Sequence, residues 1–149
     1  MAATLIVPPL ARDCYPFTHP IRVRFSETDA MGVVHHASYL PWLEEARVAL
    51  IAHGGHDYAE VHSNGLDLAV VEVNVRYRHA IRFGDAVTIH AGVGEISRTL
   101  LQIAYLLDVD GQTAATGVTA HACVNGDGRP LRVPEWLLAL GEGTTALHR

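Results

Sequence analysis

The hydrophobic pattern of the chain changes from a helical period to strand alternation after one long helix, and this change limits the folds that the chain can adopt. Between residues 39 and 53 apolar side chains recur at helical spacing and cover much of the circumference, so we expect an enclosed helix that Gly54-Gly55 ends. After residue 70 apolar and polar residues alternate, which is typical of half-buried strands. A single long apolar helix beside several strands is buried only if the strands form a sheet that curves around it.

Short turns join the predicted strands, and this favours an antiparallel sheet. The strands are predicted at residues 21–25, 71–78, 87–93, 100–109 and 113–124. The segment 100–109 is almost continuously apolar, which indicates a central strand, and Asp110-Gly111 after it is a strong hairpin signal. Residues 56–65 are predicted to be a polar connection between the helix and the strands.

The pattern predicts one domain of the α+β class. We expect a flexible arm over residues 1–19, a single domain over residues 20–141 and a tail over residues 142–149. Near the end of the domain, Pro134 is expected to open a short helix that Gly141 ends.

Composition narrows the classes of protein that this chain can belong to. Its 149 residues, 49% of them hydrophobic, suffice for one well-packed core. A net charge of −5 provides no overall basic field for nucleic acid. Cys14 and Cys123 form no framework, and neither a signal peptide nor a long apolar run is evident, so we expect a soluble cytoplasmic protein without a membrane partner.

The stretch from Arg24 to Arg47 holds the strongest chemical signal. It is read as a strand end, a tight acidic loop that turns at Gly32, and the start of the apolar helix. Helix N-termini offer unpaired backbone N–H groups to an electron-rich carbonyl, and a nearby carboxylate can act as base or nucleophile. Asp29 is that carboxylate, although most loop aspartates only cap turns.

The same stretch resembles the signature of the 4-hydroxybenzoyl-CoA thioesterase family of hotdog-fold proteins. The matching residues are Phe25-x-x-Thr-Asp29-x-x-Gly32-Val-Val-x-His36-x-x-Tyr39-x-x-Trp42-x-Glu44-x-Ala-Arg47. The likeness continues through Val75-Arg-Tyr77, Arg82-Phe-Gly84-Asp85 and Asp127-Gly128-Arg-Pro130, and so covers roughly residues 20–135. It implies a hotdog fold, in which an antiparallel sheet wraps one long helix, and hydrolysis of an aromatic or short-to-medium acyl-CoA.

The resemblance also implies roles for individual residues. Asp29 matches the catalytic aspartate, and the backbone N–H of His36 is expected to polarise the thioester carbonyl. The substrate-binding positions implied are Gly32, Val34, His35, Tyr39 and Trp42. The arginines that resemble phosphate-binding positions are Arg98, Arg129 and Arg132. Coenzyme A is part of the substrate, and we expect no separate cofactor.

Two features of the sequence depart from this pattern or compete with it. Many relatives have other residues where this chain has His35-His36. The two histidines are expected to make the pocket of this chain more polar. Glu44 and Glu45 could take the acid role, as a helix glutamate does in another branch of hotdog thioesterases, but a structural role is expected for both. His53 and His56 have metal-like spacing, yet the Gly-Gly helix stop separates them, so we expect no metal site.

Two other functions remain open from the sequence. One is hydration of an enoyl-CoA on the same fold, but the spacing and the residues between Asp29 and His35 argue against it. The other is a non-catalytic acyl-CoA-binding domain, against which the retained aspartate speaks. A carrier-protein thioester also remains open as the substrate.

A sheet wrapped around one helix leaves its edge strands uncovered, and exposed edges are usually paired. One face of the predicted strand 71–78 is polar, so its edge is the expected contact. We therefore expect a homodimer with a continuous sheet, assembled further into a homotetramer that is a dimer of dimers, with active sites between subunits.

Overall fold

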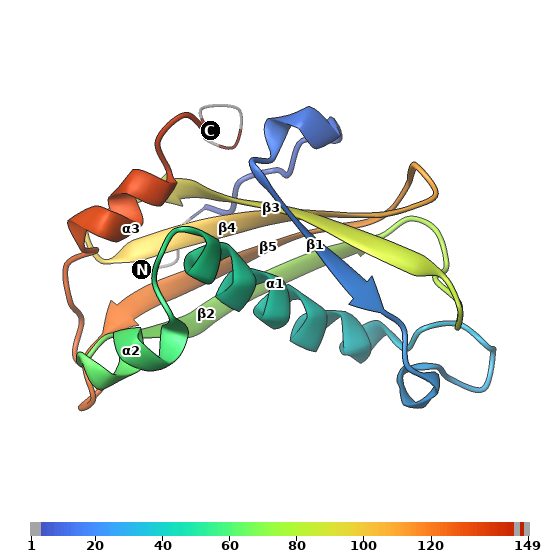
Figure 1. The fold of residues 1–149 in the computed structure, drawn as a ribbon, viewed down its shortest axis with the longest axis horizontal. Coiled ribbons are helices and arrows are strands. Elements are labelled where there is room, and N and C mark those ends of the chain that lie inside the picture. The colour runs from blue at the N-terminus through green and yellow to red at the C-terminus, as the bar shows by residue number, and fades with distance from the viewer. Residues whose placement is uncertain (1–3, 145–146, 148–149) are drawn as a thin grey trace.

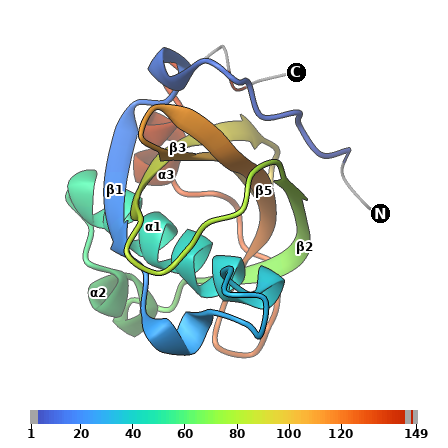
Figure 2. The same cartoon turned by 90° about the vertical axis from the view of Figure 1, so that its right-hand side faces the viewer.

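The computed structural model describes residues 4–144 and residue 147. Its sheet contains β1 (Phe17–Arg22), β2 (Asp67–Tyr77), β3 (Ala86–Ile96), β4 (Leu100–Val109) and β5 (Gln112–Val124). The strands lie in the order β1-β3-β4-β5-β2, and every neighbouring pair is antiparallel. The helix α1 (Tyr39–His53) lies across the concave face of this sheet (Figures 1 and 2). The predicted antiparallel sheet around one helix is confirmed.

The main core lies between α1 and the inner face of the sheet. The residues that α1 buries are Tyr39, Trp42, Leu43, Ala46, Arg47, Leu50 and Ile51. They pack against buried side chains of the central strands, including Ile103 and Leu107 of β4. Leu40 on the other side of α1 is 43% exposed, so the predicted enclosure of the helix is incomplete.

Local signals placed most turns correctly. Asp110 and Gly111 both have positive φ, at 52° and 80°, and they join β4 to β5 as the hairpin signal predicted. The short helix α3 (Glu135–Leu140) follows Pro134 and ends at Gly141. The prediction for residues 56–65 was wrong, because they contain α2 (Tyr58–Ser63), whose first turn the Asp57 carboxylate caps by accepting the Ala59 N–H at 2.8 Å.

The first strand differs from its prediction at both ends. It begins at Phe17, so the boundary of the arm after residue 19 was placed too late. It stops at Arg22, and Phe25 belongs to a 3-10 helix, η2 (Phe25–Glu27), where its side chain is 75% exposed.

Segments outside the predicted domain cover the outer face of the sheet. Ile6 and Tyr15 are buried with Leu147 against a second apolar cluster on the central strands, made of Ala104, Leu106 and Val118. The Ile6 N–H donates to Gln102 Oε1 at 2.8 Å. The apolar outer face of β4 and β5 requires this cover, although the arm and the tail carry no periodic pattern of their own. Residues 1–3, 145–146 and 148–149 of the predicted arm and tail lie outside the described residues.

The two edges of the sheet differ. The edge strand β1 contains Pro20, which cannot donate to a further strand. The other edge, β2, is 11 residues long, and a bulge near Val71 shifts its predicted alternation. Its exposed apolar side chains are Val70, Val71, Val73 and Tyr77. Among the helices of the described chain, none has the length and apolar character to span a membrane.

Candidate active site

The loop between η2 and α1 is held in a tight hairpin-like shape. Thr28 and Val34 form an isolated bridge, and the Asp29 N–H donates to the Val33 carbonyl at 2.8 Å. Gly32 closes the turn with φ of 79°, and its N–H donates to the Asp29 carbonyl at 3.0 Å. The Val34 N–H donates to the Ile81 carbonyl at 2.7 Å, which ties the loop to the segment before β3. Asp29 is therefore carried on a braced turn.

The Asp29 carboxylate has two different oxygens in this setting. Oδ1 accepts the Met31 N–H at 2.8 Å and lies 3.4 Å from the Val33 nitrogen, as in an Asx-turn. Oδ2 has no hydrogen-bond partner within residues 4–144. The turn-capping role that the sequence left open is thus present, and it orients the carboxylate without occupying both oxygens. Oδ2 remains available to a substrate or a water molecule.

The backbone N–H of His36 lies at the entrance to the helix. His36 is the first residue of a 3-10 helix, η3 (His36–Ser38), that leads directly into α1, and such a residue has no intrahelical acceptor for its N–H. This N–H is also not a donor in any described loop or turn hydrogen bond. The Tyr77 hydroxyl donates to the His36 carbonyl at 2.9 Å, and His35 Nδ1 accepts the Ala37 N–H at 3.1 Å. These contacts fix the peptide groups on either side of the His36 N–H, which itself has no acceptor within the described residues.

Glu27 is a member of the site that the sequence did not single out. Its carboxylate is 8% exposed and accepts the Arg24 N–H at 2.7 Å and the Trp42 Nε1–H at 2.8 Å. Its backbone carbonyl accepts the His35 N–H at 2.8 Å and the Ser38 hydroxyl at 3.2 Å. Glu27 therefore joins the loop to α1. The sequence shows a carboxylate two residues before Asp29, but it does not show that this carboxylate is buried.

The predicted substrate-binding residues fall into two groups. Gly32 and His35 are exposed on the loop. Val34, Tyr39 and Trp42 are at most 5% exposed and support the loop from the core side. The rings of His35 and His36 stack with centroids 4.1 Å apart. A direct contact of the three buried side chains with substrate therefore stays a prediction.

The two helix glutamates are engaged in surface pairs. Glu44 Oε1 lies 3.4 Å from Arg47 Nη2, and Glu45 Oε2 lies 2.6 Å from His19 Nε2. Both side chains are more than half exposed, at 68% and 61%. The pair of Glu45 with His19 is exposed and contributes little to stability, whereas Glu44 pairs with the buried Arg47. Their geometry supports the structural role expected for both residues.

The three arginines lie at the end of the sheet away from Asp29, because Arg98 follows β3 and the other two, Arg129 and Arg132, follow β5. Arg22, close to the loop, pairs with Ala86 at the start of β3, whereas Arg98 follows the far end of β3. Eleven residues of strand separate these ends, a distance of roughly 30 Å. Arg98 and Arg132 border one cavity of about 260 Å³. A single chain cannot bring them to Asp29.

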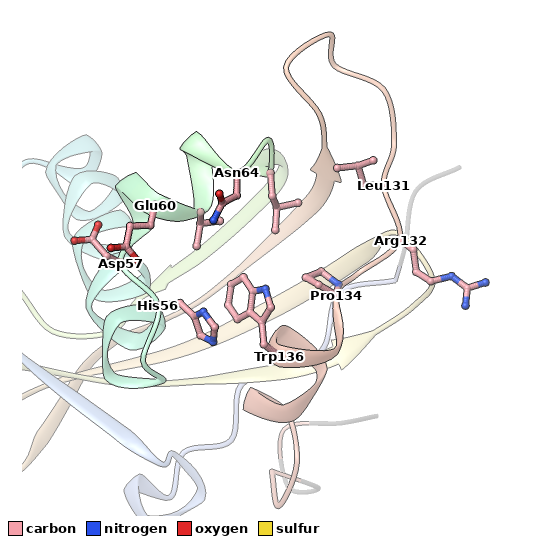
Figure 3. Close-up of a pocket in the computed structure, with 10 residues that line it drawn as sticks. His56, Asp57, Glu60, Asn64, Leu131, Arg132, Pro134 and Trp136 are labelled. Carbon is pink, nitrogen blue, oxygen red and sulfur yellow. The ribbon is translucent and has the colours of Figure 1, made fainter.

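A further cavity of about 270 Å³ lies between α2 and the segment that leads into α3 (Figure 3). The His56 ring stacks on Trp136 there, with centroids 4.0 Å apart. Arg132 borders this cavity, but Figure 3 shows its guanidinium pointing away from the other lining residues. The described part of the chain contains no group of three histidine, cysteine or acidic side chains that could hold a metal ion.

Comparison with known proteins agrees with this architecture. The 1,4-dihydroxy-2-naphthoyl-CoA hydrolase of Synechococcus elongatus is 30% identical over 122 residues, which cover 77% of this chain and 90% of that protein. The crystal structure of a hypothetical protein from Thermus thermophilus is 38% identical with a TM-score of 0.78, covering 83% of this chain and 95% of that one. The DHNA-CoA thioesterase from Staphylococcus aureus is 32% identical with a TM-score of 0.75, covering 77% and 78%.

The chain also matches a whole family of proteins. Residues 23–140 match the Thioesterase-like superfamily, and this range contains the loop, α1 and all of β2 to β5. The narrower resemblance to 4-hydroxybenzoyl-CoA thioesterases stays a prediction. The chain belongs to the Thioesterase-like superfamily.

Proposed function

We propose that the chain hydrolyses acyl-CoA thioesters, with Asp29 as the catalytic carboxylate and the His36 N–H as the donor to the thioester oxygen. The observation that supports this assignment is the pair of unused groups on one braced segment. Asp29 Oδ2 and the His36 N–H both lack partners within the described chain, while the groups around them are engaged. A thioester carbonyl placed between them would be polarised on one side and attacked from the other.

Two courses of the reaction are compatible with this geometry. In the first, an Asp29 oxygen attacks the carbonyl carbon, the C–S bond breaks, CoA leaves as a thiolate that is then protonated, and water hydrolyses the resulting anhydride. In the second, Asp29 removes a proton from a water molecule as that water attacks the same carbon, the C–S bond then breaks, and the leaving CoA thiolate is protonated. In both, negative charge develops on the carbonyl oxygen. A backbone donor at that oxygen contributes about 2.7–4 kcal/mol of transition-state stabilisation.

The exposed β2 edge supports a dimer. We infer that two copies pair their β2 strands antiparallel about a two-fold axis and so form one continuous sheet, because the β1 edge carries Pro20 and β2 exposes apolar side chains. This pairing reverses the long axes of the two chains. The arginine end of one subunit then lies beside the Asp29 loop of the other, where Arg98, Arg129 and Arg132 can bind the CoA phosphates. We propose that two such dimers form a tetramer.

The acyl group is proposed to be aromatic or short-to-medium aliphatic. Two of the relatives are named for 1,4-dihydroxy-2-naphthoyl-CoA and DHNA-CoA, which supports the aromatic choice. Both cysteines are free thiols, which supports a cytoplasmic location.

A thiol-release assay tests the proposed function. The purified chain is offered aromatic acyl-CoAs and aliphatic ones from short to long, and free CoA is measured with a thiol reagent. We expect turnover of at least one class. No thiol release from any member of the panel would contradict hydrolysis of acyl-CoA.

A further inference from the structure

A cavity of about 260 Å³ lies between α1, β2 and β5. Its apolar lining consists of Leu40, Pro41, Leu43, Val70 and Val73. Its polar lining consists of Glu44, Arg47, Tyr105, Thr119 and His121. Small-ligand pockets measure about 300–1,000 Å³, so this cavity suits one acyl group and not a whole thioester of CoA.

The first lining residue of the cavity, Leu40, lies four residues after the proposed oxyanion donor, His36. Leu40 and Pro41 belong to the first turn of α1, immediately after η3 with His36. On the facing strand, Tyr77 contacts the His36 carbonyl, and Val73 and Val70 lie further along β2. From Leu40 to Arg47 the helix rises by about 10 Å, at 1.5 Å per residue. An acyl group whose carbonyl lies at His36 would therefore point its far end at Arg47.

Arg47 starts a chain of buried polar side chains at that far end. Arg47 Nη1 lies 2.9 Å from His121 Nδ1, His121 Nε2 lies 2.7 Å from Thr119 Oγ1, and Thr119 Oγ1 lies 2.8 Å from the Tyr105 hydroxyl. All four residues are at most 6% exposed. The floor of an otherwise apolar cavity is thus polar.

The hydrogens of this chain can be assigned from chemistry. Arginine only donates, so His121 Nδ1 accepts and the imidazole hydrogen lies on Nε2. Burial and the Arg47 charge lower the pKa of His121 to about 3, which keeps the ring neutral, and the Leu68 carbonyl opposes this shift. Thr119 and Tyr105 together have two hydroxyl hydrogens but share one hydrogen bond. One hydroxyl hydrogen is therefore left over.

Arg47 also has an unused donor. Nη1 faces His121 and Nη2 faces Glu44 at 3.4 Å, but Nε is buried and has no partner among the described residues. A buried donor without an acceptor is costly, and a ligand acceptor removes that cost. Glu44 balances the Arg47 charge, so the acceptor that fits is a neutral oxygen and not an anion.

We propose that this cavity holds the acyl group, and that Arg47 is a specificity-determining residue whose Nε–H binds a neutral oxygen, hydroxyl or carbonyl, at the far end of that group. The inference rests on the proposed function and adds a substrate class to it. Because the far end of the acyl group does not react, its hydrogen bond is equal in the ground and transition states. The preference for the oxygen must therefore appear in KM and not in kcat.

The test compares octanoyl-CoA with its counterpart that carries a ketone on the penultimate carbon. We expect the full-length protein to show a KM at least about tenfold lower for the ketone, since one buried hydrogen bond to a charged donor is of that size. Arg47→Met keeps the side-chain length and removes the donors, and it should abolish the difference. Glu45→Gln changes an exposed helix glutamate that does not line the cavity and should preserve the difference. Equal KM values for the two thioesters in wild type would overturn the proposal, even if Arg47→Met did not fold.

Equilibrium binding separates this inference from the proposed function. Both thioesters are titrated into Asp29→Asn by calorimetry, where hydrolysis is not needed for the readout. Tighter binding of the ketone supports the Arg47 assignment even if wild type releases no thiol. Equal Kd values would mean that only a water molecule satisfies Arg47 Nε, and would refute the assignment while leaving hydrolysis by Asp29 intact.

Discussion

Glu27 offers the sharpest test of how the loop that carries Asp29 is held. Its carboxylate receives two hydrogen bonds, from the Arg24 N–H at 2.7 Å and the Trp42 Nε1–H at 2.8 Å, in a site where it is 8% exposed. Glu27→Gln preserves the shape but turns one acceptor into an amide donor. One of the two incoming N–H groups then faces another donor and stays unsatisfied. The substitution thus removes one hydrogen bond and the charge that pairs with Arg24 Nη2 at 3.5 Å, and it keeps the volume.

The expected loss of stability follows from these two bonds. A hydrogen bond to a charged group contributes about 1.5–3 kcal/mol, and an unsatisfied buried donor costs about 1–3 kcal/mol. Because both effects concern the same N–H group they overlap, and we expect a total loss of about 2–4 kcal/mol. For a chain of this size that lowers the Tm by roughly 5–15 °C. Because the Glu27 carbonyl also accepts from His35 and Ser38, movement of Glu27 should displace His36. We expect kcat to fall by about tenfold or more.

Thermal unfolding and thiol release measure the two effects. The matched control is Glu45→Gln, which removes the charge from an exposed pair with His19 and should cost less than about 1 kcal/mol. A Tm and a kcat for Glu27→Gln within the range of this control would refute the role of Glu27 as the link between the loop and α1.

Three further outcomes are expected. Val71→Lys places a charge on the exposed β2 edge outside the acyl cavity and should convert the proposed dimer to a monomer in light scattering; an unchanged mass would place the interface elsewhere. Arg98→Ala or Arg132→Ala should raise KM several-fold at constant kcat, less so with a thioester that lacks the nucleotide, and an unchanged KM in both variants would remove them from phosphate binding. The lowered pKa of His121 means that its protonation favours the unfolded chain. Stability should therefore fall by up to about 1.4 kcal/mol per pH unit as the pH drops from 6.5 towards 3, and a His121→Asn variant that keeps this slope would contradict the assignment.

The sequence predicted those elements whose residues carry their own local signal. The strand β4 matches its predicted bounds, residues 100–109, because it is buried on both faces and bounded by a hairpin turn. The helix α1 ends at His53 before Gly54-Gly55, as predicted. In contrast, Ile6 and Tyr15 have no period, and their burial depends on the outer face of strands nearly 100 residues later.

The candidate site also contains residues that local sequence could bring together and residues that it could not. Asp29 and His36 lie on one short segment, so their proximity could be inferred from the loop motif. Arg47 and His121 are 74 residues apart, and only the curvature of the sheet around α1 brings them together. The distance between the arginines and Asp29 could also not be predicted, because it depends on the direction of the strands in the sheet.

Asp29→Asn, compared with Glu44→Gln and Glu45→Gln, tests the central assignment most directly. The measurement is kcat for thiol release together with Kd for the same acyl-CoA. We expect Asp29→Asn to keep the fold and the binding of acyl-CoA and to lose at least about a hundredfold in kcat, the lower end for a general base, while both glutamine variants stay active. Near wild-type kcat in Asp29→Asn together with an inactive Glu44→Gln or Glu45→Gln would place the catalytic carboxylate on α1 and contradict this account.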